Sequence, residues 1–581
     1  ALYGSINQPR VLGKSYPDGR SLMPSHGILD ANTMVDGIFD RLSLRIADRL
    51  VAPNPKSNRR ELIPLSTARS PYFCSGCPHN SSTKVPEDSL IGAGIGCHTM
   101  VLLMDEEQVG NIAGVTAMGN EGMQWIGMEP FVKRNHFIQN IGDGTYFHSG
   151  QLAIASAISA NSNITFKLLY NGTIAMTGGQ DPKGGLEVAD ITKVMVAQGV
   201  KEIIITTEDV RKYRRLKLPN NVRVWDRSQV VKAQEVLAEI DGVTVLIHDQ
   251  SCAAQLRRMR KRDVVPKPDF RVFINHRICE ACGDCGDVSN CLSVQSQETM
   301  LGPKALIDQD SCNFDASCIK GDCPSFMTVE IDPERPNSAF RRRDEAIELP
   351  EPEVKVPTDK LDLRLAGIGG TGVVTAAQIL ATAAMLDGYE VRGLDQTGLS
   401  QKAGPVVSDL RFTRGAPRPS NLLMQQSADV IIGFDLLVAS SDKAMEVARE
   451  GKTILVASET ETPTGEMIGN PLGRLPDTDE LFERISNCIK RESSFLVDSG
   501  TLCKALFGSV MSSNIFLLGV SVQLGALPVS PESFNQAIKL NNVSVEGNLE
   551  AFKWGRAWVV DSGHVEQETQ RGTLASEPKA I

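Results

Sequence analysis

The sequence predicts an α/β protein of several domains, in which two sheet regions flank a small cysteine-rich module. In residues 67–270, and again in residues 360–560, short apolar runs alternate with helical stretches. That rhythm is typical of strands in a mainly parallel sheet. Residues 271–332 contain seven cysteines and little apolar periodicity, so bound ligands rather than a hydrophobic core must order this segment.

Composition restricts the class of protein. A chain of 581 residues with 41% hydrophobic and 22% charged residues has room for roughly three or four ordinary globular domains. Its net charge of −10 argues against nucleic acid or an anionic membrane as the main partner. No apolar run is long enough to span a bilayer, and the first twenty residues lack the apolar centre of a secretory signal.

Cysteine usage indicates the compartment. Eleven of the 13 cysteines lie between Cys74 and Cys323, mostly a few residues apart. In a large chain without a secretory signal, clustered thiols are more often metal ligands than disulfides. We therefore expect a reduced, cytoplasmic protein.

The remaining segments are short or polar. Residues 1–66 contain one amphipathic helix at about 30–50, for which Asp30 or Asn32 could be the cap. Its apolar stripe consists of Val35, Ile38, Phe39, Leu42 and Ile46. Such a segment cannot form a core alone, so we expect it to dock on another subunit. Residues 333–359 form a charged, proline-containing linker, and the polar residues 561–581 are expected to be a disordered tail.

The motif "IGDGTYFHSG" predicts a cofactor site. Gly142, Asp143 and Gly144 end an apolar run, and Asn171 ends the next one, with 26 residues between Gly144 and Asn171. On a parallel βαβ unit, Asp143 and Asn171 then stand at the carboxyl ends of successive strands, where such sheets bind ligands. Asp and Asn oxygens suit Mg²⁺. A lone GDG is also a common turn, but this spacing resembles the thiamine diphosphate (TPP) motif, which implies the carbonyl of Thr173 as the third ligand.

The cysteine-rich module resembles a two-cluster bacterial ferredoxin. In that pattern the fourth cysteine of each run ligates the other cluster. The first cluster would take Cys279, Cys282, Cys285 and Cys323. The second would take Cys291, Cys312 and Cys318, with Asp315 at the position of the middle ligand. A carboxylate can bind iron, although its hard oxygen suits the cluster less well than a thiolate. A zinc ribbon is the alternative, but seven cysteines in this order do not form an ordinary zinc site.

A further four cysteines lie in the same region as the TPP motif: Cys74, Cys77, Cys97 and Cys252. A CxxC pair alone would indicate redox thiols or zinc. Four such residues close to a TPP motif indicate a cluster placed beside the cofactor.

Together, "CSGCPH", "GIGCH", "GDGTYFHSG" and "YNGTIAMTGGQ" resemble the 2-oxoacid:ferredoxin oxidoreductases, and within them the indolepyruvate branch. The resemblance is to the C-terminal half of the long fused bacterial form: a TPP-binding domain, a ferredoxin insert and a gamma domain. It implies a proximal [4Fe-4S] cluster on the four cysteines above. It also implies oxidative decarboxylation of a 2-oxo acid, transfer of the acyl group to coenzyme A, and electron transfer to ferredoxin. His79, His98 and His148, beside these motifs, are the candidate catalytic side chains.

One departure from this family is large. The pyrimidine-binding domain, with the glutamate that activates thiamine, does not precede these motifs. We expect a second subunit to carry it, in a symmetric pair of heterodimers. Two alternatives remain: a non-oxidative TPP decarboxylase, which has no use for cluster cysteines, and an electron-transfer scaffold with a non-catalytic TPP site.

Two further motifs have competing interpretations. "GIGGTG" at 367–372 follows a strand and precedes a helix, and Asp395 ends the next strand. This is a dinucleotide fingerprint, but the resemblance favours tight strand–helix packing or a role around coenzyme A. "LRRMRKRD" at 256–263 is either a solvated helix face or a docking patch for an acidic electron carrier.

Overall fold

The computed structural model describes residues 13–26, 29, 31–49, 62–177, 179–182, 184–331, 348–401, 403–416, 420–468, 470 and 472–576. The chain divides into two compact units, Ala1–Pro64 and Leu65–Ile581. Within the described residues, no helix is long and apolar enough to cross a membrane.

The first unit contains the expected helix, α1 (Ala31–Ile46). Three residues of its apolar stripe are exposed: Val35, Ile38 and Leu42. Since the helix begins at Ala31, Asn32 lies inside it rather than at its cap, and Asp30 lies outside the described residues.

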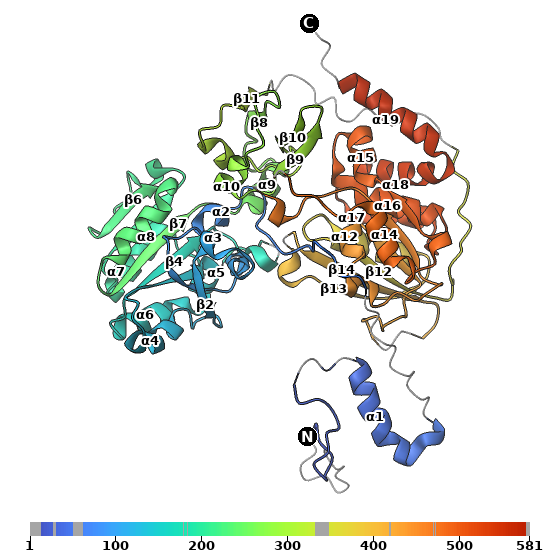
Figure 1. Ribbon diagram of the computed structural model, residues 1–581, viewed down its shortest axis with the longest axis horizontal. Coiled ribbons are helices and arrows are strands. Elements are labelled where there is room, and N and C mark those ends of the chain that lie inside the picture. The colour runs from blue at the N-terminus through green and yellow to red at the C-terminus, as the bar shows by residue number, and fades with distance from the viewer. Residues whose placement is uncertain are drawn as a thin grey trace. The chain divides into compact units, whose positions relative to one another are not determined.

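The second unit begins with a seven-stranded sheet in which every strand pair is parallel (Figure 1). Its order is β2 (Asn111–Val115), β1 (Leu90–Ala93), β3 (Phe137–Gly142), β4 (Ile164–Tyr170), β7 (Val243–Asp249), β5 (Ile203–Thr207) and β6 (Val222–Asp226). The four apolar runs "HFIQNIG", "ITFKLLYN", "KEIIITT" and "VTVLIHD" are β3, β4, β5 and β7, as predicted.

Helices cover both faces of this sheet. Helices α6 (Gln151–Ser159) and α7 (Val188–Gln198) pack on the face that includes Ile203 and Ile205. Helix α8 (Val230–Ala238) packs on the opposite face, against Ile204. Burial on both faces explains why the strands read as continuous apolar runs rather than as alternating ones. The other helices of this region are α2 (His79–Ser82), α3 (Glu106–Val109), α4 (Met123–Met128), α5 (Asp143–Thr145) and α9 (Ala253–Lys261).

The cysteine-rich module follows. Strand β8 (Phe270–Ile274) pairs antiparallel with β11 (Phe326–Glu330), and β9 (Val294–Thr299) forms a hairpin with β10 (Gly302–Ile307). One short helix, α10 (Asp284–Ser289), lies between β8 and β9 in sequence. The small hydrophobic core of the module contains two of the cysteines, Cys279 and Cys285. This agrees with a module that depends on its ligands for order.

The last region is a six-stranded mixed sheet. Its order is β13 (Glu390–Gln396), β14 (Pro405–Thr413), β12 (Lys360–Ile368), β15 (Val430–Gly433), β16 (Ile454–Ser458) and β17 (Phe495–Val497). Strand β14 is antiparallel to both of its neighbours, whereas β12, β15, β16 and β17 are parallel. The helices are α11 (Val373–Leu386), α12 (Leu436–Ala439), α13 (Asp442–Met445), α14 (Thr478–Ser486), α15 (Ser499–Phe507), α16 (Ser513–Gln523), α17 (Pro531–Asn541), α18 (Val545–Val560) and α19 (Ser562–Ser576).

The expectation of a disordered tail is wrong for residues 562–576, which form α19 (Figure 1). This helix contacts α15 and α18. Val565 is fully buried, and the ring of His564 stacks on Trp554 with 6.2 Å between centroids. These few apolar contacts order a segment whose average composition is polar.

Candidate functional site

The loops that follow the parallel strands carry most of the predicted site residues. Because all seven strands run in one direction, their carboxyl ends share one edge of the sheet. The loop after β1 contains Cys97 and His98, and the turn after β3 contains Asp143. Asn171 follows β4, and Cys252 follows β7. The sheet therefore gathers the predicted cofactor ligands and two of the proximal cysteines at one edge.

Asp143 holds two of these loops together. Its Oδ1 accepts a hydrogen bond from the backbone N–H of Gly144 (2.7 Å). Its Oδ2 accepts from the N–H groups of Asn171 (3.0 Å) and Gly172 (2.8 Å). The residue is 2% exposed. Burial raises the pKa of the carboxyl group, although these N–H groups oppose the rise by stabilising the carboxylate.

The turn after β4 supplies the other two predicted ligands. The side-chain oxygen of Asn171 accepts a hydrogen bond from the N–H of Thr173 (3.1 Å). Between them Gly172 has a φ of +71°, a conformation that a glycine adopts without strain. The carboxylate of Asp143, the amide oxygen of Asn171 and the carbonyl of Thr173 are the hard oxygen ligands that suit Mg²⁺. This donor set fits the magnesium ion of a TPP site.

Close approach of backbone to cofactor requires small residues, and the GDG turn provides them. A Cβ at Gly142 would lie 3.1 Å from Cε1 of His98, and a Cβ at Gly144 would lie 3.2 Å from Cγ1 of Ile174. There is little room for a side chain at either position, so the turn presents backbone to the sheet edge.

Two of the three candidate histidines lie together in the interior. His79 and His98 are 3% and 2% exposed, and their ring centroids are 5.8 Å apart. Burial lowers the pKa of His98 to about 4 and that of His79 well below its usual value, so both rings are neutral at pH 7. Nε2 of His98 is buried with no hydrogen-bond partner. His148, in contrast, is exposed, and its Nδ1 bonds to Ser149 Oγ (2.7 Å).

The structure brings the four proximal cysteines near one another. Burial raises the pKa of Cys77 well above its usual value, and the charges of Cys74, Cys97 and Cys252 raise it further. Such mutual effects require neighbouring thiols. Thiols with raised pKa values would be held as thiolates only by binding metal, which displaces the proton.

Among the other seven cysteines, mutual effects on the pKa link members of each of the two predicted sets. Burial raises the pKa of Cys285 to about 11, and the charges of Cys279, Cys282 and Cys323 add to the rise. Burial also raises the pKa of Cys318 to about 12, with Cys291 and Cys312 as the next contributors. Cys285 contributes too, so the two sets are neighbours.

The set of Cys291, Cys312 and Cys318 also lies next to the proximal cysteines. The N–H of Gly76, between Cys74 and Cys77, points at Sγ of Cys291 at 3.3 Å. An N–H group aimed at a sulfur stabilises the thiolate form. The cysteines thus form a continuous series: proximal set, then Cys291 with Cys312 and Cys318, then Cys279 with its three companions.

A single metal ion does not fit these thiols as they stand. Among the described residues, no group of three or more His, Cys, Asp or Glu side chains converges on a point that could hold one ion. A zinc site requires such convergence. In an iron–sulfur cluster each thiolate binds a different iron, so the sulfurs stand further apart. Sets of four and of three thiols have the ligand chemistry of the iron–sulfur clusters that the resemblance implies, and these clusters remain a prediction.

Two arginines of the basic stretch 256–263 bond to the backbone of the cysteine-rich module. Arg257 donates to the carbonyl groups of Asp310 and Ser311, and Arg260 donates to the carbonyl of Asn313 (2.8 Å). These arginines hold the loop that carries Cys312, so they are not part of a purely solvated face, and the carrier-docking patch stays a prediction. Their partners lie more than fifty residues away in sequence, and no local pattern indicates them.

The glycine turn "GIGGTG" has the packing role rather than the dinucleotide role. A Cβ at Gly367 would lie 2.8 Å from Cγ2 of Val373 and 3.0 Å from Cβ of Phe434. Strand β14 separates β12 from β13, so Asp395 does not end a strand next to the glycine turn. Instead its Oδ1 accepts a hydrogen bond from Ser408 (2.6 Å). Because β13, which carries Asp395, is not the parallel neighbour of β12, the ribose-binding position of a dinucleotide fold does not form.

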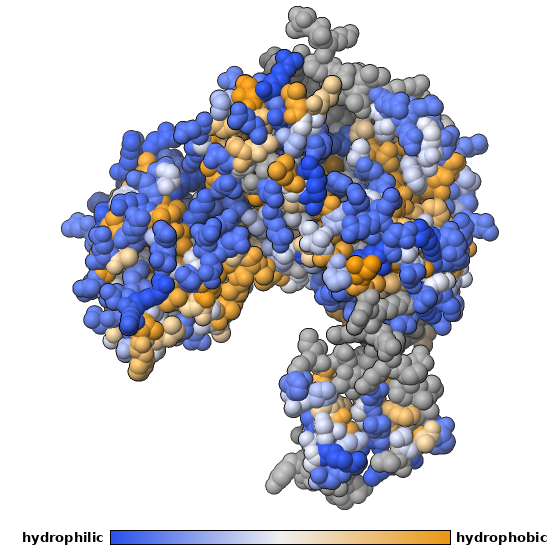
Figure 2. Space-filling model, viewed as in Figure 1, coloured by the Kyte–Doolittle hydropathy of each residue, from blue (hydrophilic) through white to orange (hydrophobic). Residues whose placement is uncertain are grey.

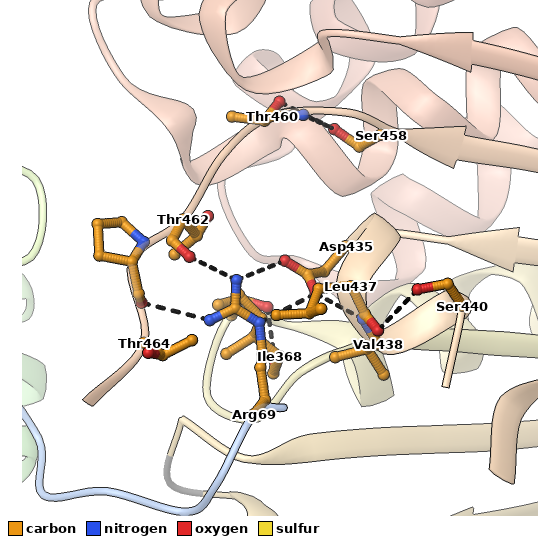
Figure 3. Close-up of polar contacts among 12 residues, drawn as sticks. Arg69, Ile368, Asp435, Leu437, Val438, Ser440, Ser458, Thr460, Thr462 and Thr464 are labelled. Atoms are coloured by element: carbon orange, nitrogen blue, oxygen red, sulfur yellow. Dashed lines mark hydrogen bonds and ion pairs between the residues drawn. The ribbon is translucent and has the colours of Figure 1, made fainter. Parts of the chain in front are cut away.

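Arg69 is a buried residue that sequence reasoning missed. Figure 3 shows its guanidinium group beside Asp435, with Nε to Oδ1 at 3.0 Å and Nη2 to Oδ2 at 2.8 Å. It also donates to the carbonyl groups of Thr462 (2.5 Å) and Pro463 (3.3 Å). Both charged side chains are 4% exposed. The segment that leads to Cys74 is therefore anchored on the mixed-sheet region.

Two family models match the chain. Residues 94–216 match "Thiamine pyrophosphate enzyme, C-terminal TPP binding domain", and residues 362–558 match "Pyruvate ferredoxin/flavodoxin oxidoreductase". The first range contains Asp143, Asn171 and Thr173. The predicted TPP-binding domain is therefore confirmed as a domain type.

Curated relatives match parts of the chain. Indolepyruvate oxidoreductase subunit IorB of Pyrococcus horikoshii is 28% identical over 195 residues, 33% of this chain and 92% of that protein. Subunit IorA of Archaeoglobus fulgidus is 26% identical over 328 residues, 54% of this chain and 48% of that protein. The chain thus spans about half the length of that IorA subunit. A solved structure, pyruvate oxidoreductase subunit PORC from Thermotoga maritima, is 19% identical, with 34% of this chain and 96% of that one covered at a TM-score of 0.26.

Proposed function

We propose that this chain, which belongs to the 2-oxoacid:ferredoxin oxidoreductase family and is of the indolepyruvate type, binds TPP and removes electrons during the oxidative decarboxylation of a 2-oxo acid. The main support for this proposal is that predicted cofactor ligands and predicted cluster cysteines lie at the same edge of one sheet. One edge of one sheet presents both Asp143 with Asn171 and the cysteines Cys97 and Cys252. A decarboxylase that released an aldehyde would need the first pair and not the second.

The residues of this edge have separable roles. Bound TPP supplies an electron sink for decarboxylation. Asp143, Asn171 and Thr173 would hold the Mg²⁺ and hence the diphosphate end of the cofactor. His98, buried, neutral and with an unpaired Nε2, is placed to bond a polar group at the same turn. His148 is exposed on the following helical turn and is a weaker candidate for contact with substrate.

The order of the cysteine sets favours one electron path. The proximal set lies beside the cofactor edge, and the Gly76–Cys291 contact leads to the set of Cys291, Cys312 and Cys318. Cys318 of that set is close enough to Cys285 for Cys285 to raise its pKa. Cys285 belongs to the last set, which includes the exposed Cys282. We propose that electrons leave through that last cluster to an iron–sulfur carrier such as ferredoxin, and that coenzyme A takes the acyl group.

The rest of the TPP site belongs on a further subunit, in our proposal. The relatives are named subunits IorA and IorB, and about half of IorA is matched here. Near the carboxyl ends of β1 and β2 several large apolar side chains are exposed: Ile95 (40%), Leu102 (44%), Leu103 (52%), Val115 (43%), Met118 (40%) and Leu152 (70%). Figure 2 shows hydrophobic surface along this edge of the domain, where Figure 1 labels β2, α5 and α4. An exposed apolar surface of this kind is typical of a protein interface.

The experiment uses the chain in complex with its natural partner, purified without oxygen. Indolepyruvate, phenylpyruvate and aliphatic 2-oxo acids are offered with coenzyme A and a viologen dye as electron acceptor. We expect dye reduction that requires TPP, Mg²⁺ and coenzyme A, with aryl substrates the fastest. Aldehyde formation without dye reduction would indicate the non-oxidative decarboxylase instead. Dye reduction that does not require added or bound TPP would favour the scaffold alternative.

A further inference from the structure

Asp315 occupies the position at which a ferredoxin pattern has a cysteine, yet its carboxylate contacts other protein groups. Oδ1 accepts hydrogen bonds from Arg227 Nη1 (2.5 Å) and Gln250 Nε2 (2.9 Å). Oδ2 accepts from the hydroxyl of Ser317. Arg227 Nη2 also donates to the backbone carbonyl of Asp315 (3.1 Å). Both carboxylate oxygens are therefore engaged, by three donors.

Two of those donors come from the TPP-binding domain. Arg227 begins the turn after β6, and Gln250 follows β7, two residues before Cys252. The side chains of Arg227 and Asp315 are 10% and 11% exposed. An arginine cannot discard its proton at this depth, so it needs an anion beside it. In the described residues, the carboxylate of Asp315 is the anion that accepts a hydrogen bond from Arg227.

Other residues of the loop around Asp315 also contact the TPP-binding domain. The side chain of Asn313 donates to the carbonyl of Ser75 (2.7 Å), next to Cys74. A Cβ at Gly76 would lie 2.9 Å from Cβ of Asp315. Arg260, on α9 of the TPP-binding domain, lies over the ring of Phe314, 5.6 Å from its centroid. Arg271, on β8 of the module itself, lies 4.5 Å from the same centroid. Asp315 thus packs against the proximal-cysteine loop, within a segment that is fastened to the TPP-binding domain.

We propose that Asp315 is not an iron ligand but the anion of a buried ion pair with Arg227 that fixes the ferredoxin-like module on the TPP-binding domain. The cluster in that loop is then held by Cys291, Cys312 and Cys318 alone. Three thiolates hold three irons, and the fourth corner has no protein ligand. This inference rests on the proposed iron–sulfur function. It replaces the expectation, drawn from spacing, that Asp315 completes the ligand set.

The test is EPR and Mössbauer spectroscopy of the full chain in its native complex, purified without oxygen and oxidised with a mild oxidant. We expect the wild type to show the signal of an oxidised three-iron cluster beside two cubanes, about eleven irons per chain rather than about twelve. Asp315→Asn should keep that signal. Asp315→Cys should lose it and gain about one iron, because a thiolate then occupies the open corner.

Loss of the ion pair could loosen the loop, so two further variants are needed. Arg227→Gln with Asp315→Asn removes both charges together and should retain the three-iron signal. Arg223→Gln is the matched control, because Arg223 pairs with Glu202 (2.8 Å) at a more exposed site on β6. Three cubanes in the wild type, with a three-iron signal only in the Asp315→Asn variants, would overturn the inference and leave the proposed function intact. A preparation without iron, or with zinc, would instead refute the proposed function.

Discussion

Gly142-Asp143-Gly144 at the end of β3 and residues 367–372 at the end of β12 are both glycine-rich turns that lead from a buried strand into a helix. Their neighbours differ. Beside β3 lies β4 in parallel, with Gly142 opposite Leu169, and Asn171 follows at the same edge. Beside β12 lie the antiparallel β14 and the parallel β15. In the turn after β3, the carboxylate of Asp143 accepts hydrogen bonds from backbone N–H groups of the loop after β4. The turn after β12 is instead packed against Val373 and Phe434.

The resemblance between the two turns extends one strand further. Asp435 follows β15 just as Asn171 follows β4, at the carboxyl end of the parallel neighbour. In the mixed sheet, however, Arg69 covers that acid with a bidentate ion pair (Figure 3). A similar strand arrangement thus leaves one edge available for a cofactor and closes the other with a side chain of the chain itself. Whether such a glycine turn can bind a ligand therefore depends on the residues that follow the neighbouring strand.

The largest expected effect concerns the closed edge. Arg69→Met should lower the free energy of unfolding of the mixed-sheet region by about 3–5 kcal/mol, because it leaves the carboxylate of Asp435 buried without its partner. Differential scanning calorimetry would measure this. Arg223→Met, which removes an exposed ion pair with Glu202, is the control and should cost under about 1 kcal/mol. Equal effects of the two variants would contradict a buried, structural role for Arg69.

The open edge should respond in its ligand affinity. Asp143→Asn should weaken TPP binding in the presence of Mg²⁺ by ~100-fold or more, since even outer-shell partners of a metal ligand contribute 10–100-fold. Isothermal titration would measure it, and iron content should remain unchanged. Asp395→Asn in the mixed sheet should not alter TPP affinity. A wild-type affinity in Asp143→Asn would refute the assignment of this turn.

The glycines of the two turns provide a smaller contrast. Gly367→Ala forces a Cβ to within 2.8 Å of Val373 and 3.0 Å of Phe434, so we expect a loss of ~1–3 kcal/mol in stability. In Gly144→Ala the nearest atom, 3.2 Å away, is Cγ1 of the flexible Ile174 side chain, so stability should change little while TPP affinity falls. Thermal unfolding and titration of both variants separate the two roles. If both variants changed stability alone, the contrast would fail.

A further contrast is a pH dependence on β4. Lys167 is fully buried, donates to Gln234 (3.0 Å), and burial lowers its pKa to about 7. From pH 7 to about 10 the unfolded state binds this proton and the folded state does not, so stability should rise with pH by up to about 1.4 kcal/mol per unit. Arg364 on β12 is equally buried but paired with Asp409 (2.7 Å). In Lys167→Met, a comparison of melting temperatures at pH 7 and pH 9 should show that rise reduced; an unchanged slope would contradict it.

The comparison also shows what the sequence could predict. The spacing of Asp143 and Asn171 was sufficient to predict that they lie at one edge of the sheet, because successive parallel strands of a βαβ unit end at the same edge. The repeated cysteine pattern predicts the cluster sets in the same way, and those sets stay a prediction. The partners of Arg69 and Arg227 were not, because 366 and 88 residues separate them from Asp435 and Asp315. The position of β14 between β12 and β13 was also hidden, since an apolar strand reads alike in either direction.

In the proposed function, decarboxylation at the open edge sends electrons into the cysteine-bound clusters. The direct measurement mixes the anaerobic, TPP-loaded complex with indolepyruvate, without dye or ferredoxin, and follows visible absorbance and EPR through a single turnover. We expect the iron–sulfur absorbance to bleach and reduced-cluster signals to grow as CO₂ is released, and we expect neither change in Asp143→Asn. Release of CO₂ with an aldehyde product, while every cluster stays oxidised, would contradict the account.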